Sequence, residues 1–106
     1  MYNDDLILRI IQQLAEAIGR WRRGELDRAG LDEAAQNVLG LSVRTLDMLP
    51  SVALVSALNT GDGLGKGRLL AAAELLEALA GDPTHPRARA RRAKAADLRA
   101  AAEVDA

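Results

Sequence analysis

Apolar residues near the start of the chain recur at the three- and four-residue spacing of one helix face. They are Leu6, Ile7, Ile10, Ile11, Leu14, Ile18 and Trp21. Leu8 and Ala15 fall beside this face and widen it to about 200°, more than the stripe of a typical surface helix. The pattern predicts a first helix that contacts neighbours on two sides. We expect Asn3 or Asp4 to cap this helix and Gly24 to end it.

Two shorter helices are predicted next. Apolar positions from about residue 26 to residue 39 form one face of a helix that Gly40 ends, so the first two helices make a hairpin. Ser42 is placed to cap a short helix that runs through residue 48.

Pro50 separates that short helix from the one after it, because proline lacks the N–H that the helix ladder needs. Ser51 is expected to cap a helix through residue 58, with four buried candidates in it: Val52, Leu54, Val55 and Leu58. Four glycines in residues 61–67 then predict an interhelical loop.

The last third of the chain predicts a second long hairpin. Residues 68–80 place Leu69, Leu70, Ala73, Leu76 and Leu79 on one helix face, and Gly81 follows. Residues 82–86 contain two prolines and predict a turn. A last helix over residues 86–104 has a thin core face, Ala88, Ala95, Leu98 and Ala102, so it is expected to be loosely packed unless the alanines allow close approach.

Composition agrees with an all-α fold. The 106 residues include 21 Ala and 18 Leu against 5 Val, 4 Ile and no Phe. Such a balance favours helix over strand. We therefore predict a single helical domain over residues 1–106, built from helical hairpins with five to six helices and no sheet.

Two segments resemble the turn and second helix of a tetratricopeptide unit. Residues 23–29 place Gly24 five positions before Ala29, and the last predicted helix places Ala88 seven positions before Ala95. In that family a glycine opens the turn, and small residues at these spacings let the helices approach. Two departures are that Gly81 lies seven rather than five positions before Ala88 and that Gln36 replaces the first unit's second small residue.

The opening Asn-Asp-Asp-Leu-Ile-Leu-Arg-Ile-Ile-Gln-Gln-Leu at residues 3–14 resembles that of a small, uncharacterised bacterial family of helical proteins related to these repeats. The segments 39–42 and 68–70 resemble that family too. Together these resemblances imply stacked helical hairpins, but a shared fold does not imply a particular activity. The groove of such a stack typically receives a peptide or another helix.

Charge is close to balanced overall and uneven along the chain. Fourteen basic and fifteen acidic residues give a formal charge of −1. Residues 87–106 hold six basic and three acidic residues, +3, and residues 1–86 therefore carry −4. No signal peptide or membrane-spanning stretch is evident, so we expect a cytoplasmic protein, and the arginine- and alanine-rich composition is typical of a GC-rich bacterial genome.

Few catalytic groups are available. Without cysteine and with the single histidine His85, the chain lacks the residues for a thiol nucleophile or a multi-histidine metal site. His85 is expected to be an exposed turn residue. Residues 61–67 suggest a phosphate-binding loop, but the glycine–lysine spacing is one residue short and Gly67 replaces the hydroxyl residue that would hold magnesium, which favours a plain loop. We therefore expect no enzyme activity, no cofactor and no metal.

The first helix provides the leading functional hypothesis, a non-enzymatic module for protein–protein interaction or self-association, most simply a homodimer. Its broad apolar face would bury against a partner helix, while polar residues set the register. The candidate partner-binding residues are Leu8, Arg9, Ile11, Gln13, Ala15 and Trp21. Trp21 also fits a role in the core.

A nucleic-acid-associated protein is the alternative. The basic last helix would contact phosphates through Arg87, Arg89, Arg91, Arg92 and Lys94. No aromatic residues interleave with these cations for base stacking, so this hypothesis ranks second.

Overall fold

The computed structural model describes residues 2–81 and 84–104, with side chains from Asp5 onward. Six α-helices account for most of that part of the chain, and no strand occurs in it. The helices are α1 (Tyr2–Arg22), α2 (Arg28–Leu39), α3 (Val43–Met48), α4 (Ser51–Leu58), α5 (Gly65–Ala80) and α6 (Ala88–Val104). The prediction of an all-α protein is confirmed.

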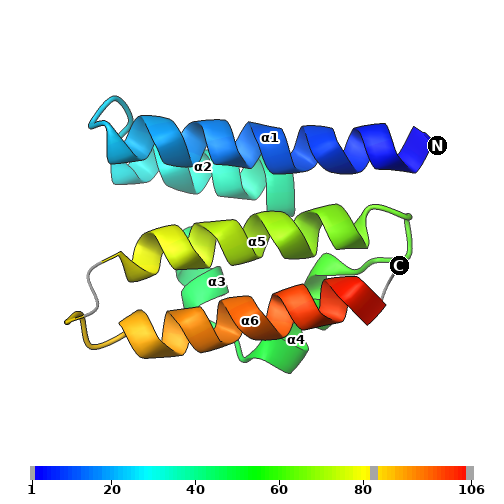
Figure 1. Ribbon diagram of the computed structural model, residues 1–106. Helices are drawn as coiled ribbons and strands as arrows, with labels where there is room; N and C mark the ends of the chain where they lie inside the picture. Colours follow the sequence, from blue (N-terminus) through cyan, green and yellow to red (C-terminus); the bar gives the residue numbers. More distant parts are fainter. Residues whose placement is uncertain (1, 82–83, 105–106) are drawn as a thin grey trace.

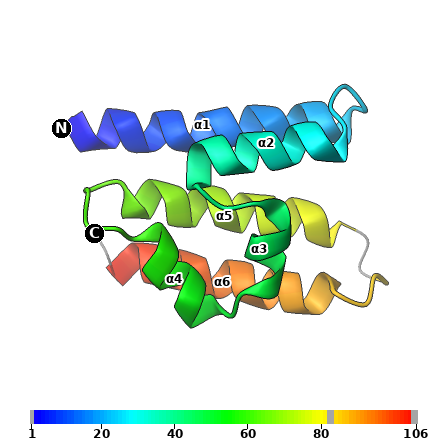
Figure 2. The same ribbon diagram turned by 180° about the vertical axis from the view of Figure 1, so that it is seen from behind.

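The helices form two layers (Figures 1 and 2). One layer holds α1, α5 and α6 side by side, and α2, α3 and α4 lie behind it. In the first layer α5 lies between α1 and α6 and also contacts every helix of the second. α5 runs antiparallel to α6 and parallel to α1 (Figure 1). The fold is therefore organised around α5.

The first hairpin has the predicted pattern with small changes at the helix ends. α1 already includes residues 3 and 4, so neither Asn3 nor Asp4 is its N-cap. Gly24 follows α1 with φ 75°, and the Glu25 N–H donates to the Arg20 carbonyl, a Schellman-type stop. α1 packs against both α2 and α5, as its wide apolar sector predicts.

The start of α2 lies later than predicted. This helix begins at Arg28 rather than near residue 26, because the Asp27 carboxylate accepts the Gly30 N–H at 2.8 Å and so caps it. Ser42 caps α3 as predicted, accepting the Thr45 N–H at 3.1 Å.

The predictions for α4 are partly wrong. Its N-cap is Pro50 and no side chain caps it, since the Ser51 hydroxyl donates to Asp97 of α6 at 2.7 Å instead. Leu54 and Leu58 are fully buried, whereas Val52 is 84% exposed. The eight residues of α4 bury only one side, and Val52 lies on the other.

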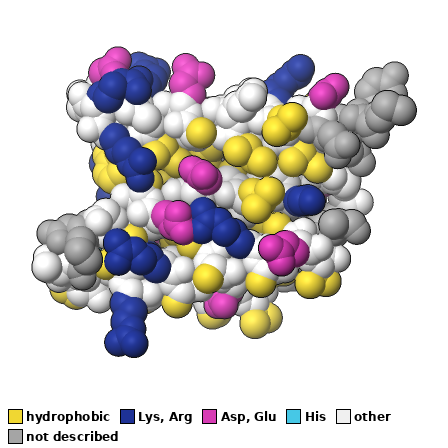
Figure 3. All heavy atoms as spheres, in the orientation of Figure 1, with side chains coloured by type: hydrophobic (Ala, Val, Ile, Leu, Met, Phe, Trp, Pro, Cys, Tyr) yellow, Lys and Arg dark blue, Asp and Glu magenta, His cyan; other side chains and the backbone are white. Residues whose placement is uncertain are grey.

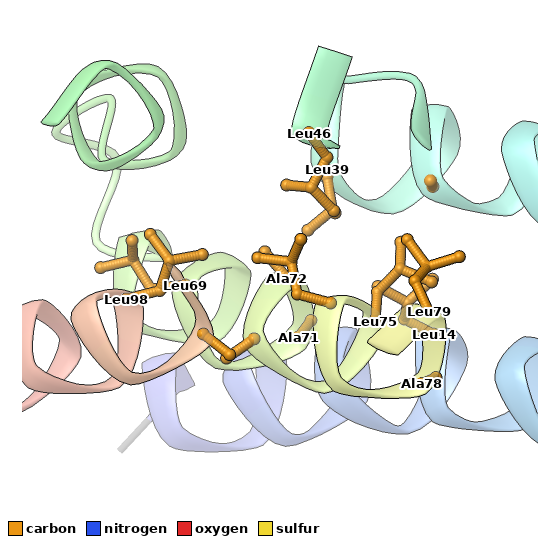
Figure 4. Packing of buried hydrophobic residues seen from close by; sticks show 14 of the residues in the cluster. Leu14, Leu39, Leu46, Leu69, Ala71, Ala72, Leu75, Ala78, Leu79 and Leu98 are labelled. Atoms are coloured by element: carbon orange, nitrogen blue, oxygen red, sulfur yellow. The ribbon is translucent and has the colours of Figure 1, made fainter. Parts of the chain in front are cut away.

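α5 is longer and more buried than predicted. It begins at Gly65, so the last part of the expected loop is the first turn of the helix. Its buried residues are spread around the helix rather than along one face: Gly65, Gly67, Leu69, Ala71, Ala72, Ala73, Leu75, Leu76, Ala78, Leu79 and Ala80. In Figure 4, Leu39 of α2, Leu46 of α3 and Leu98 of α6 point toward it. A helix apolar all round is typical of the centre of a core.

α6 packs closely on α5. It begins at Ala88 rather than at residue 86, because the Ala88 N–H donates to the His85 carbonyl and closes a separate turn. Of the residues in the predicted turn, Asp82 and Pro83 lie outside the described part. The predicted core residues of this helix, Ala88, Ala95, Leu98 and Ala102, are all at most 1% exposed. Of the two alternatives that the sequence left open, close approach through the alanines is therefore the one that occurs.

Candidate functional site: the furrow between α1 and α5

The amino-terminal half of α1 is covered on one side only. α2 has 12 residues against 21 in α1 and lies along its carboxyl-terminal half, so the first turns of α1 extend past it (Figures 1 and 2). This part of α1 carries two of the exposed large apolar side chains of the molecule, Leu6 at 40% and Leu8 at 53%. At 100° per residue the two leucines lie about 160° apart around the helix, so they do not form one surface, and Leu8 is the one that borders α5.

A hollow of about 320 Å³ lies beside Leu8, between α1 and α5. Its lining is Ile7, Leu8, Ile11, Lys66 and Leu70, which we call the α1–α5 furrow. Figure 3 shows hydrophobic side chains gathered between these two helices, with charged side chains around them. Aliphatic walls and one cation give the furrow no chemistry for bond making or breaking. It is suited to bury apolar side chains.

Gly67 sets how close the two walls of the furrow come. A Cβ at this position would lie 3.2 Å from the Cα of Ile7, closer than nine in ten real Cβ contacts. Gly65 is similarly crowded, since its Cβ would lie 2.5 Å from Oδ1 of Asn59. Both glycines thus belong to the packing of α5. This packing role explains why glycines occur at positions 65 and 67, so a bound phosphate is not needed to explain them.

The six residues predicted to bind a partner divide into three groups. Leu8 and Ile11 line the furrow, and Ala15 is exposed one turn further along the same side of α1. Arg9 and Gln13 are also exposed, but at 100° per residue they lie about 100° and 140° around the helix from Leu8, away from the furrow.

Trp21 forms the third group by itself. It is partly buried and packs against the core cluster. It lies at the other end of α1 from the furrow, so the structure does not bring it together with Leu8 and Ile11.

Lys66 and Leu70 are furrow residues that sequence reasoning missed as site residues. Lys66 was expected in a loop and Leu70 in the core. Their four-residue spacing would have placed them on one side of a helix, but only if the helix were known to start at Gly65. Because four glycines in residues 61–67 indicate a loop, the helical spacing of Lys66 and Leu70 could not be recognised from the sequence.

Three of the basic residues in and just before α6 are engaged within the molecule. Arg91 pairs with the Asp47 carboxylate of α3, Nε to Oδ1 at 2.9 Å, and Arg87 pairs with the same carboxylate at 3.1 Å. Lys94 donates to the Asp47 backbone carbonyl at 2.8 Å. These cations therefore hold α6 against the carboxyl-terminal end of α3, where a helix dipole favours positive charge.

The pKa values of Asp47 and Lys94 are shifted by their neighbours and by burial. The hydrogen bond from Arg91 lowers the pKa of Asp47 below its ordinary value of 3.8, against the opposing effect of burial. Burial lowers the pKa of Lys94. The Nη1 of Arg91 also donates to the Leu79 carbonyl of α5 at 2.9 Å. Three of the five cations assigned to nucleic acid are thus committed to the fold.

The remaining two cations of α6 differ. Arg92 donates to the Gly81 carbonyl at 3.4 Å, a long hydrogen bond. Arg89 is exposed, and within the described residues it makes no hydrogen bond or ion pair. A phosphate-binding face would need several free cations in a row, and here the geometry leaves Arg89 with only a weakly held neighbour.

A second charged cluster holds the turn before α5. Arg68 forms an ion pair with Asp62 and also donates to the Leu58 carbonyl at 3.3 Å. The hydrogen bond from Arg68 is the main cause that lowers the pKa of Asp62 to about 2. Arg68 also borders a hollow of about 390 Å³ behind α5. Because its guanidinium is already paired, this hollow offers no free cation to an anionic ligand.

Candidate catalytic and metal-binding groups do not assemble elsewhere in the described chain. His85 is exposed in the turn before α6, where its Nδ1 accepts the Arg87 N–H at 3.1 Å. Within residues 2–81 and 84–104 no group of three or more His, Asp or Glu side chains is arranged to hold a metal ion. The furrow is therefore the candidate site that the geometry supports best.

In comparisons with protein-family models, curated proteins and solved structures, no significant match to this chain is found. The resemblance to tetratricopeptide repeats stays a prediction. Among the described helices none combines the length and the apolar character that crossing a bilayer requires.

Proposed function

We propose that this protein is a non-enzymatic interaction module that self-associates through the α1–α5 furrow. The observation that carries the proposal is that a projecting leucine and an apolar hollow lie on the same face. Leu8 is 53% exposed, and the hollow beside it is lined by Ile7, Ile11 and Leu70. A two-fold interface uses the same patch on both copies, so that patch must offer both a projection and a recess.

Burial of apolar surface is the driving force in this proposal. Burying a fully exposed leucine side chain contributes about 1.5–3 kcal/mol. Leu8 is 53% exposed, so covering the rest of it contributes roughly half of that, and a two-fold dimer gains this twice. The rear face of the molecule is less suitable. Its exposed apolar residues, Met48 at 67% and Val52 at 84%, border none of the hollows described above.

The test is a Leu8→Asp variant, measured by size-exclusion chromatography with light scattering over a range of protein concentrations. We expect the unmodified chain to approach twice its mass of 11.3 kDa as the concentration rises. We expect the variant to weaken the dimer at least 100-fold, since two carboxylates would be buried per interface. Circular dichroism at 222 nm should stay unchanged, because Leu8 is half exposed.

Val52→Asp is the matched control. It introduces the same charge on an exposed apolar residue of α4, far from the furrow, and it should leave the dimer intact. A chain that is monomeric at every concentration would contradict the proposal. So would a Leu8→Asp variant that dimerises as tightly as the unmodified chain.

A further inference from the structure

Along the side of α5 that borders the furrow, Lys66, Leu70 and Glu74 follow one another at four-residue spacing. At 1.5 Å per residue the first and last are separated by about 12 Å along the helix axis. One end of this stripe is thus basic, its centre apolar and its other end acidic. Lys66 and Leu70 line the furrow, and Glu74 is exposed beyond it.

Lys66 and Glu74 have no ion-pair partner among the residues described. Glu77, the next carboxylate on the same helix, pairs with Arg99 of α6, and Glu74 lies close enough to this pair to help raise the pKa of Arg99 without contacting it. Lys66 and Glu74 are thus two charges of opposite sign without a direct ion pair, placed symmetrically about Leu70. Such a pattern is complementary to its own reverse.

The side chains of α1 that border the furrow show a corresponding pattern, which is one of side-chain size rather than of charge. Ile7 of α1 lies against Gly67 of α5, and the two helices run parallel, so both stripes advance together. On α1 the large side chain of Leu8 is at the same end as Lys66, and the small Ala15 is about 10 Å further on. Reversing the direction of a second copy would bring a large residue onto a small one.

We propose that two copies dock through the furrow about a two-fold axis that lies in the interface, perpendicular to the helices, at the level of Ile11 and Leu70. This geometry makes α5 of each copy antiparallel to α5 of the other. It places Lys66 of one copy opposite Glu74 of its partner, twice per dimer, and Leu8 opposite Ala15. The inference rests on the proposed self-association and adds which orientation the two copies adopt.

Electrostatic complementarity of this kind fixes the orientation of a complex more than it adds affinity. In an arrangement with parallel helices and the two-fold axis running along α5, Lys66 would face Lys66 and Glu74 would face Glu74. The antiparallel arrangement removes both repulsions and replaces them with two attractive pairs. It also leaves Arg9 and Gln13 outside the contact, because they lie on another side of α1.

The test is a charge-reversal set, Lys66→Glu, Glu74→Lys and the double variant, with dimer dissociation constants measured by analytical ultracentrifugation. We expect each single reversal to weaken the dimer about 10-fold or more, since like charges then face each other twice. The double reversal restores opposite pairs and should return the constant to within about 3-fold of the unmodified chain. Circular dichroism at 222 nm on each single variant checks that it is folded.

Glu33→Lys provides the control, because it makes the same charge change on an exposed residue of α2 in the other layer and should leave dissociation unchanged. If the dimer is broken by Leu8→Asp but is indifferent to both single reversals, the antiparallel docking is overturned and the proposed function stands. If the unmodified chain never dimerises, both are overturned.

Discussion

Gly67 shows how a single residue sets the distance between two helices. It lies in the first turn of α5, where a side chain would meet the backbone of Ile7 in α1. Gly19, in the interior of α1, is the contrasting case, since a Cβ there would meet only the end of the flexible Arg23 side chain, at 3.3 Å. Glycine is therefore needed for helix packing at position 67, whereas at position 19 it can be replaced.

This contrast predicts opposite effects of two alanine substitutions. Gly67→Ala should destabilise the fold by about 1 kcal/mol, because an overpacking cost of about 1–3 kcal/mol exceeds the gain of about 1 kcal/mol in helix propensity. Gly19→Ala should stabilise it by about 0.5–1 kcal/mol, through propensity alone. Urea denaturation followed at 222 nm measures both changes. Equal shifts for the two variants would show that the approach at Gly67 is not tight.

At the scale of elements, α6 is held by polar contacts as much as by its apolar face. Its buried residues are mostly alanines, which bury little surface each. Asp47 at the carboxyl-terminal end of α3 compensates by receiving Arg87 and Arg91, and its side chain is only 18% exposed. The outer pair Glu77–Arg99 joins α5 to α6 with side chains that are 47% and 37% exposed.

Asp47→Asn should therefore cost more stability than Glu77→Gln. We expect a loss of about 1–3 kcal/mol at pH 7 for Asp47→Asn, since charged hydrogen bonds are removed from a shielded site. The exposed Glu77 pair should contribute less than about 1 kcal/mol. Urea midpoints of the two variants measured side by side make the comparison, and similar losses would contradict it.

The pH dependence of stability follows from the same contact. Because the folded-state pKa of Asp47 is lowered, its contribution is fully present above the ordinary value of 3.8 and is lost as the pH falls through the folded value. The unmodified chain should thus lose more stability than Asp47→Asn between pH 5 and pH 3. Parallel pH profiles for the two proteins would show that Asp47 is not coupled to folding.

At the scale of the whole molecule, one core cluster draws residues from all six helices. α5 contacts every other helix, and α6 covers the side of α5 that carries Leu69 (Figure 4). The radius of gyration, 12.9 Å, is that of a compact chain of this length. Because each helix completes the burial of another, removing one outer helix affects the whole fold.

We expect a chain that stops at Gly81 to lose its cooperative thermal transition. Removing α6 uncovers an apolar side of α5 and leaves Asp47 without its cations, and a domain of this size has only about 5–15 kcal/mol of net stability. Thermal melting followed by circular dichroism is the measurement. A sharp transition in the shortened chain would contradict the central role of α5 and α6.

This expectation also decides how nucleic-acid binding should be tested. Removal of α6 would abolish binding and folding together, so it cannot distinguish them. Arg89→Ala in the full chain removes the one α6 cation that has no partner among the described residues, without disturbing the Asp47 cluster. An effect of this variant on binding to a fluorescent oligonucleotide at low salt would support the nucleic-acid hypothesis.

Much of the fold was predictable because the relevant signals are local. The apolar periodicity of α1, the Ser42 cap and the alanine face of α6 each depend on residues within a few turns of one another. Errors arose where a distant residue changed the outcome. Ser51 does not cap α4 because Asp97, 46 positions away, receives its hydroxyl.

Only one of the two walls of the candidate site could be predicted from the sequence. Leu8 and Ile11 follow from the width of the apolar sector of α1, but the opposite wall of the furrow does not. Lys66 and Leu70 become wall residues only because α5 begins inside a glycine-rich segment and lies parallel to α1. The cations in and just before α6 were misleading for the same reason, since their partner Asp47 is 40 or more residues away.

By itself, the sequence determined the helical class, the two hairpins and the apolar face of α1, because helix propensity and 3.6-residue periodicity act over short stretches of chain. Only the tertiary structure decided that α5 is central, that α6 is held by Asp47 and that Leu8 borders a hollow. Those features depend on which surfaces meet, and contacts between distant segments form only when all the helices bury their apolar faces together.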